Sequence, residues 1–129
     1  MSALDDVKKT AANLVGHFGS ARVNEYFACF SECADFIFYT HSERLNSRKA
    51  YEDLWKTWEV EMNFKVLSCT STNQDLKLVG DNVAIFTHNV STDISTNDGA
   101  DTVAERETIV FELVNGSWIA IHEHLSPAL

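Results

Sequence analysis

Positively charged residues are scarce in this 129-residue chain, which has 10 Lys and Arg against 19 Asp and Glu and a formal net charge of −9. A nucleic-acid-binding surface needs clustered lysine and arginine, and an anionic membrane repels an acidic chain, so neither partner is expected. No apolar stretch approaches the roughly 20 residues of a membrane span, and no basic segment followed by an apolar run opens the chain. We therefore expect a cytoplasmic protein.

Motifs for cofactors and covalent catalysis are also missing. The chain has no glycine-rich phosphate loop, no dinucleotide fingerprint and no Gly-x-Ser-x-Gly elbow. Its three cysteines, Cys29, Cys33 and Cys69, lack metal-ligand spacing and are interpreted as buried structural thiols. We expect no cofactor and no metal.

The spacing of apolar residues changes once along the chain. A helical period of 3.6 dominates the first half, and a period of 2 takes over from Phe64. Ser2, Ser20 and either Asn46 or Ser47 are candidate helix caps. The predicted helices cover residues 3–16, 20–34 and 48–61, and the predicted strands cover residues 36–41, 64–78, 83–94, 102–113 and 117–125.

Helices followed by a run of antiparallel strands indicate an α+β fold, with the helices packed on one face of the sheet. At this length a single domain over residues 1–129 is expected, because one core suffices to bury roughly 65–70% of the unfolded chain's surface. On the strand 83–94, the more apolar set is assigned to the face that contacts the helices: Ala84, Phe86, His88, Val90 and Ile94.

The last hairpin admits two registers around Asn115-Gly116. A two-residue turn would pair Val114 with Ser117, whereas a three-residue bulged turn would shift the second strand by one residue. A shift of one residue exchanges the two faces of a strand, so the register that separates apolar from polar side chains is favoured. The bulged turn does so, and it is the prediction adopted.

This register decides which titratable groups face the helices. It places Glu107 directly opposite Glu123 on the apolar face, together with Ile109 and Leu125. The polar face then pairs Arg106 with His124 and Thr108 with His122. His122 and His124 form an i, i+2 pair, but Arg106 would repel a cation, so a dimer contact that also includes Trp118 and Val110 is expected there rather than a metal site.

The order of elements and the chain's ending carry a resemblance. A strand with Glu-Thr-Ile-Val-Phe at 107–111 is followed by a Gly-x-Trp turn at 116–118 and by His-x-His-x-Ser at 122–126. This pattern resembles the SnoaL-like and ketosteroid-isomerase-like branch of the nuclear transport factor 2-like (NTF2-like) superfamily. It is especially similar to the association domain of calcium/calmodulin-dependent protein kinase II.

The resemblance implies a cystatin-like, NTF2-like cone: three N-terminal helices packed on a strongly curved, mostly antiparallel sheet that encloses a pocket. It also implies a homodimer or larger ring joined through the outer face of the sheet. The association domain carries arginines in its pocket, and the matching positions here are Ile109, Leu125 and Val90. Since all three are apolar, a small apolar or aromatic ligand is expected.

Glu107 and Glu123 are the first candidates for catalysis, because two facing carboxylates on an apolar surface split their proton affinities, as general acid/base chemistry requires. His88, on the same assigned face, titrates near neutrality, and Tyr39 and His41 end the first strand where a donor could sit at the pocket mouth. The alternative is that both carboxylates lie at a solvated rim or pair with an arginine, and that His88 and Tyr39 are structural.

Trp55, Trp58 and Phe86 are candidates for the apolar lining, together with Val90, Ile109 and Leu125, although an aromatic stripe at helical spacing also fits plain core. Two functions follow from these residues. The first is a small-molecule-binding protein acting as a cofactor-free isomerase, cyclase or dehydratase. The second is a non-catalytic ligand-binding or oligomerisation module.

Overall fold

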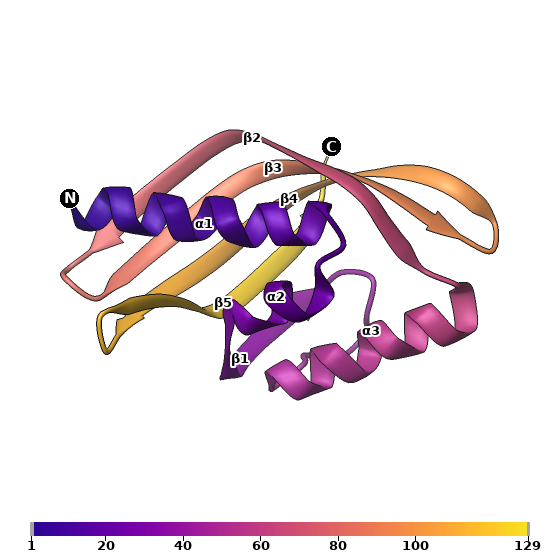
Figure 1. The fold of residues 1–129 in the computed structure, drawn as a ribbon, viewed down its shortest axis with the longest axis horizontal. Coiled ribbons are helices and arrows are strands. Elements are labelled where there is room, and N and C mark those ends of the chain that lie inside the picture. Colours follow the sequence, from indigo (N-terminus) through magenta and orange to yellow (C-terminus); the bar gives the residue numbers. More distant parts are fainter. Residues whose placement is uncertain (1, 129) are drawn as a thin grey trace.

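The computed structural model describes residues 2–128, and its elements follow the predicted order of helices first and strands afterwards. Figure 1 shows the helices on one side of a long, bent sheet. The helices are α1 (Ala3–Gly19), α2 (Val23–Ala28) and α3 (Arg48–Met62), and the strands are β1 (Phe30–Phe38), β2 (Lys65–Val79), β3 (Val83–Thr96), β4 (Gly99–Val114) and β5 (Ser117–Pro127).

Two of the predicted helix caps are present. The Ser2 hydroxyl accepts a hydrogen bond from the amide of Asp5 at 3.1 Å, and the Ser47 hydroxyl accepts one from the amide of Ala50 at 3.1 Å. Each bond satisfies an amide that the first helical turn leaves without a carbonyl partner. The helix at 48–61 is thus confirmed within one residue, and the helix at 3–16 continues to Gly19.

The prediction for residues 20–41 was wrong in two respects. Helix α2 spans only Val23–Ala28, with Arg22 rather than Ser20 at its cap, and β1 begins at Phe30 instead of residue 36. Phe30 was assigned to the helix because it continues the apolar stripe, but it is fully buried as the first residue of a strand. A register shift between Phe30 and Asp35 hides the strand's alternation from the sequence.

The sheet has the order β1-β5-β4-β3-β2, and only the β1–β5 pair is parallel. Helix α1 packs along β2, while α3 packs on β1 at the far end of the sheet. The β3–β4 hairpin curves over toward the end of α3 (Figure 1), where the amide of Asn97 donates a hydrogen bond to the carbonyl of Met62 at 2.7 Å. The predicted α+β cone with a mostly antiparallel sheet is confirmed.

The predicted bulged turn between β4 and β5 is wrong. Val114 pairs with Ser117, and Asn115 and Gly116 both have positive φ (51° and 82°), as a two-residue type I′ turn requires. The irregularity lies farther along, where Phe111 pairs with Ala120 but Val110 pairs with His122. Ile121 is therefore the extra residue of a bulge in β5.

The bulge changes several predicted residue pairs, but Glu107 and Glu123 still face the helices, as predicted. Glu107 pairs with Leu125 and Glu123 pairs with Ile109, so the two glutamates are diagonal rather than directly opposite neighbours on the inner face. Arg106 pairs with Ser126 and Thr108 with His124, not with the histidines predicted. Trp118 packs against the core instead of joining an outer-face contact.

The core between helices and sheet is dominated by aromatic rings, which pack edge-to-face and tilted across α2, β1 and α3. The predicted inner face of β3 is confirmed, with Ala84, Phe86, His88 and Val90 all buried. The expectation of buried thiols fails for Cys33, which is exposed, whereas Cys29 and Cys69 are half-buried. Within residues 2–128, no helix is long and apolar enough to cross a membrane.

Candidate functional site

A cavity of about 680 Å³ lies between the helices and the inner face of the sheet. Apolar and aromatic side chains from α1, α2 and α3 form one wall, and β3, β4 and β5 contribute the polar groups of the other. The lining residues are Leu14, Val15, Phe18, Tyr26, Phe38, Tyr39, Thr40, Tyr51, Trp55, Trp58, Met62, Phe64, Cys69, His88, Val90, Thr92, Ile94, Thr96, Asp98, Gly99, Ala100, Asp101, Val103, Glu105, Glu107, Glu123 and Leu125.

Most of the predicted site residues reach this cavity. The structure brings together Tyr39, Trp55, Trp58, His88, Val90, Glu107, Glu123 and Leu125. Three others do not line it. Phe86 and Ile109 are buried in the core, and His41 lies in the turn after β1, where its amide donates a hydrogen bond to the carbonyl of Phe38 at 3.0 Å. Facing inward on the sheet therefore did not guarantee contact with the cavity.

His88 holds Glu107 in place. Its Nε2 lies 2.6 Å from Oε1 of Glu107, and its Nδ1 lies 2.6 Å from the Ser71 hydroxyl. Gln74 donates to the same hydroxyl oxygen at 2.7 Å, which leaves the Ser71 proton free to be donated to Nδ1 of His88. In that arrangement Nε2 carries the proton that is donated to Glu107. The His88 side chain is fully buried and that of Glu107 is 13% exposed.

The two glutamates hold their protons very differently. Burial raises the pKa of Glu107, but hydrogen bonds from Glu123 and His88 act in the opposite direction, as does attraction to His88 when its ring is protonated, and together they bring that pKa below its usual value. For Glu123, burial, the charge of Glu107 and the hydrogen bond to Glu107 all act in one direction and raise the pKa well above its usual value. Glu123 therefore keeps its proton to a higher pH than Glu107, which ionises first.

One side-chain oxygen of Glu123 is buried without a hydrogen-bond partner. The residue is 3% exposed, and its Oε1 has no partner within residues 2–128. Most buried polar atoms are hydrogen-bonded, and leaving one unpaired is costly. Because Glu123 lines the cavity, an occupant that donates an N–H or O–H could satisfy this oxygen.

Tyr26 of α2 and Tyr51 of α3 complete the polar end of the cavity, and neither is among the site residues predicted from the sequence. The hydroxyl groups of Tyr26 and Tyr51 lie 2.9 Å apart, and both residues are buried. Burial, followed by the charge of Glu123, raises the pKa of each well above its usual value, so both stay protonated. The available signal was that a buried tyrosine hydroxyl needs a partner.

Glu105 is a third carboxyl group in the cavity and was also missed. It follows the alternation of Glu107 on β4, which places both on the inner face. The hydroxyl of Tyr39 donates to its Oε2 at 2.7 Å, and burial together with this contact raises the pKa of Tyr39 to about 12. Burial raises the pKa of Glu105 despite the hydrogen bond from Tyr39.

Of the arginines that could pair with the two glutamates, Arg22, Arg44 and Arg48, two have other partners. Arg48 lies 3.7 Å from Glu32 and 3.6 Å from Glu52, and it donates to the carbonyl of Phe30. Arg22 donates to His17. The polar contacts of the pair come instead from His88 and Tyr26. A proton donor and a proton acceptor thus share the polar wall of a cavity whose opposite wall is apolar and aromatic.

A helical layer on a curved sheet with this cavity is the NTF2-like, cystatin-like fold, and similar solved structures agree. The hub homology domain of the kinase CaMKII from Chlamydomonas reinhardtii is 19% identical, with full coverage of both chains and a TM-score of 0.76. An NTF2-like protein of unknown function from Prochlorococcus sp. NATL2A is 17% identical, with 100% and 95% coverage of this chain and its own, and a TM-score of 0.79. The association domain of CaMKII from C. elegans is 15% identical, with 95% and 93% coverage and a TM-score of 0.72.

The chain belongs to the SnoaL-like domain family, whose sequence profile matches residues 7–129. No curated protein matches it significantly. At these identities, the structural likenesses establish the fold alone.

Proposed function

We propose that the protein binds a small, largely apolar molecule in the cavity and catalyses a proton transfer on it without a cofactor. The observation that carries this proposal is the buried carboxyl pair, in which Glu123, whose Oε1 has no partner among the described residues, has a raised pKa and Glu107 a lowered one. A general base must be ionised and a general acid must be protonated at the same pH, and this pair meets both conditions.

The step would begin at a carbon next to a carbonyl group of the substrate. Glu107 takes the proton from that carbon, the electron pair of the broken C–H bond moves toward the carbonyl oxygen, and Glu123 donates its proton to that oxygen. When Glu123 takes its proton back from the enol oxygen and Glu107 delivers its proton to a different carbon of a conjugated substrate, the result is an isomerisation and both residues are restored. Cyclisation and dehydration of suitable substrates share the first step.

The surrounding residues support these roles. His88 donates to Glu107 and orients it, so His88 acts as a positioning residue. The apolar body of the substrate would lie against Trp55 and Trp58, which line the cavity from α3. Tyr39, 44% exposed, stands at the solvent side of the cavity next to Glu105.

A hydrogen-exchange assay tests the proposed reaction. 2-Tetralone, an apolar ketone with acidic α-protons, is incubated with the protein in heavy water, and deuterium incorporation is followed by NMR. We expect exchange faster than in buffer, and a fall of about 10²–10⁴-fold in the enzymatic rate for Glu107→Gln and for Glu123→Gln. Glu112→Gln removes one carboxylate from the outer face of the same strand and should retain the rate. Exchange that does not exceed the buffer rate, or that survives both substitutions, would refute the proposal.

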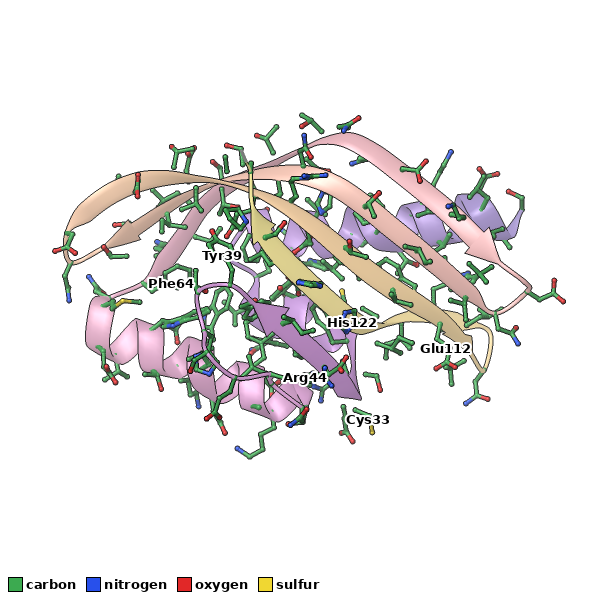
Figure 2. The ribbon with its side chains drawn as sticks, turned by 180° about the vertical axis from the view of Figure 1, so that it is seen from behind. Cys33, Tyr39, Arg44, Phe64, Glu112 and His122 are labelled. Atoms are coloured by element: carbon green, nitrogen blue, oxygen red, sulfur yellow. The ribbon has the colours of Figure 1, made fainter. Side chains whose placement is uncertain are left out.

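A second candidate function is assembly through the outer face of the sheet. Val83, Ile85, Val110 and Ile119 are half-buried there, and Ile85 pairs with Val110. Figure 2 looks onto this face, with Glu112 and His122 toward the viewer and the helices behind the sheet. An apolar sheet face without a covering layer supports a contact between two copies of the chain, as in the association domains that this chain resembles.

Light scattering tests the assembly. We expect a homodimer or larger ring at micromolar concentration, and dissociation by Val110→Lys, which places a charge on the outer face. Asn13→Lys, at an exposed position of α1 on the other side of the molecule, is the control for an added positive charge. A wild-type monomer at micromolar concentration would exclude this candidate.

A further inference from the structure

The charges that line the cavity are of one sign. Five acidic residues line it, namely Asp98, Asp101, Glu105, Glu107 and Glu123, of which Glu123 is the proposed neutral acid. No lysine or arginine is among the described lining residues, and His88 is already engaged with Glu107. Because the whole chain also carries a formal net charge of −9, the potential inside the cavity is negative. An anionic ligand would be repelled, and a cation would be attracted.

A second, independent observation indicates a hydrogen-bond donor on the ligand. Oε1 of the buried Glu123 has no hydrogen-bond partner in the part of the chain that the structure describes, and Glu123 is a residue of the lining. Two groups near Glu123 are Glu107, which Nε2 of His88 holds, and Tyr26, whose hydroxyl lies 2.9 Å from that of Tyr51. A molecule in the cavity would supply the partner that Oε1 lacks, and an ammonium group offers the strongest donor for a carboxyl oxygen.

The opposite wall suits both a cation and an apolar body. Trp55, Trp58 and Phe64 form a mutual aromatic cluster, with ring centroids 5.2–6.1 Å apart, and all three line the cavity. Aromatic faces attract ammonium groups, tryptophan most strongly. They also offer a large apolar surface for the rest of the ligand.

We propose that the ligand class of this cavity is a protonated amine on an apolar or aromatic body. The ammonium group lies between Glu105 and Glu123 and donates to Oε1 of Glu123, while the body packs against Trp55 and Trp58. The inference rests on the proposed binding in this cavity and names the ligand of that same site. It narrows the apolar ligand expected from the sequence to one that carries a positive charge.

Three probes of one shape test the charge preference: 3-phenylpropan-1-amine, 3-phenylpropan-1-ol and 3-phenylpropanoate. Their phenyl group leaves tryptophan fluorescence selectively excitable, so binding can be followed by the emission of Trp55 and Trp58 and checked by calorimetry. We expect the amine to bind about tenfold or more tightly than the alcohol, and the carboxylate to bind most weakly, because one charged contact in a desolvated site is worth at least that factor. Equal affinity of the three probes, tighter binding of the carboxylate, or no binding of any probe would overturn the inference.

Two matched variants test whether the preference for the amine comes from the charge of Glu105 in the cavity. Glu105→Gln should lower the affinity for the amine about tenfold and leave that for the alcohol unchanged, since only the charge of the side chain is removed. Glu112→Gln makes the same change on the outer face of β4 and should leave both affinities unchanged. A loss of amine affinity that is equal in the two variants would overturn the assignment, because it would reflect net charge rather than the cavity.

The outcome is separable from that of the proposed reaction. Affinity is measured without turnover, so a failed exchange assay with selective amine binding would refute the reaction and leave the ligand class standing. Exchange of 2-tetralone without a preference for the amine would refute the ligand class and leave the reaction standing.

Discussion

Replacing Glu123 with glutamine should stabilise the protein, and the gain should grow with pH. The folded state raises the pKa of Glu123 above that of the unfolded chain, chiefly through burial and the charge of Glu107. A carboxyl group with a raised folded pKa stabilises fully below its unfolded pKa, and this contribution is lost as the pH rises toward the folded pKa. Glutamine keeps the shape of the neutral acid and a hydrogen-bond donor for Glu107, but its side chain does not ionise.

The magnitude follows from proton linkage. The pKa of Glu123 in the unfolded chain is about 4.3. Above that pH, the free energy of unfolding of the wild type falls by about 1.4 kcal/mol per pH unit relative to that of Glu123→Gln, and the fall ends once the pH passes the folded pKa. At pH 7 the largest gain in the free energy of unfolding that Glu123→Gln can give is therefore about 4 kcal/mol. The contribution of Glu107 to stability has the opposite dependence on pH, because its folded pKa is lowered. Its stabilising contribution is present above the unfolded pKa and is lost only in more acidic solution, so measurements above about pH 5 isolate Glu123.

Urea unfolding followed by circular dichroism, at intervals of pH from about 5 to 8, measures this difference. The slope of the free energy difference against pH is the informative quantity, since it reports a proton that the folded protein retains. Glu112→Gln controls for the loss of one negative charge from a strongly acidic chain. A pH-independent difference between Glu123→Gln and the wild type, or a glutamine variant that is less stable throughout, would show that Glu123 is ionised in the folded protein.

Three further substitutions probe the framework of the site, each measured by urea unfolding. His88→Leu should cost about 3–5 kcal/mol, because it leaves the Glu107 carboxylate buried without its partner, and a cost below about 1 kcal/mol would contradict the tight pairing at 2.6 Å. Tyr51→Phe should cost about 1–2 kcal/mol through the lost bond to the Tyr26 hydroxyl, and an unchanged stability would mean that water replaces it. Gly19→Ala should cost about 1–3 kcal/mol, since an added Cβ would lie 3.0 Å from a side chain of β2, whereas Gly16→Ala, with open space around it, should cost nothing.

The sequence predicted the elements whose periodicity is local and missed one whose partner is remote. Helix α3 and the strands from β2 onward have clear periods and flanking turns, and their predicted bounds lie within a few residues of those observed. Strand β1 pairs in parallel with β5, some 90 residues later, and its irregular register removes the alternation that marks a strand. An apolar run such as Tyr26, Phe27 and Phe30 then fits a helix equally well.

The site was predicted in part for the same reason. Side chains on one face of a strand follow from alternation, which located His88, Glu107 and Glu123 correctly. The two buried tyrosines come from different helices, and nothing in the local pattern says that their hydroxyl groups meet. Phe86 and Ile109 show a second limit of the method. Alternation predicts correctly that both face the helices, but it does not predict that they lie in the core and not in the cavity.

The bulge at Ile121 shows how a wrong register still led to the correct face for Glu123. Separation of apolar from polar residues requires one extra residue in the hairpin, and that requirement was sound. The prediction placed the extra residue in the turn. In the structure Asn115-Gly116 forms a regular two-residue turn, and the extra residue lies in β5, between Ala120 and His122. Before the bulge, Trp118 and Ala120 pack inward, and after it Glu123 and Leu125 do.

That single residue also sets the chemistry of the cavity. Without the bulge, the alternation that starts at Trp118 would continue inward through His122 and His124, and Glu123 would face outward. The cavity would then contain two imidazoles in place of the neutral carboxyl group, and Glu107 would lack the neighbour whose proton it shares. In the folded chain, His122 instead bonds to Asp35 of β1 at 2.7 Å, at the parallel edge of the sheet. The acid and the base of the proposed reaction are therefore brought together by a strand irregularity whose position has no marker in the sequence.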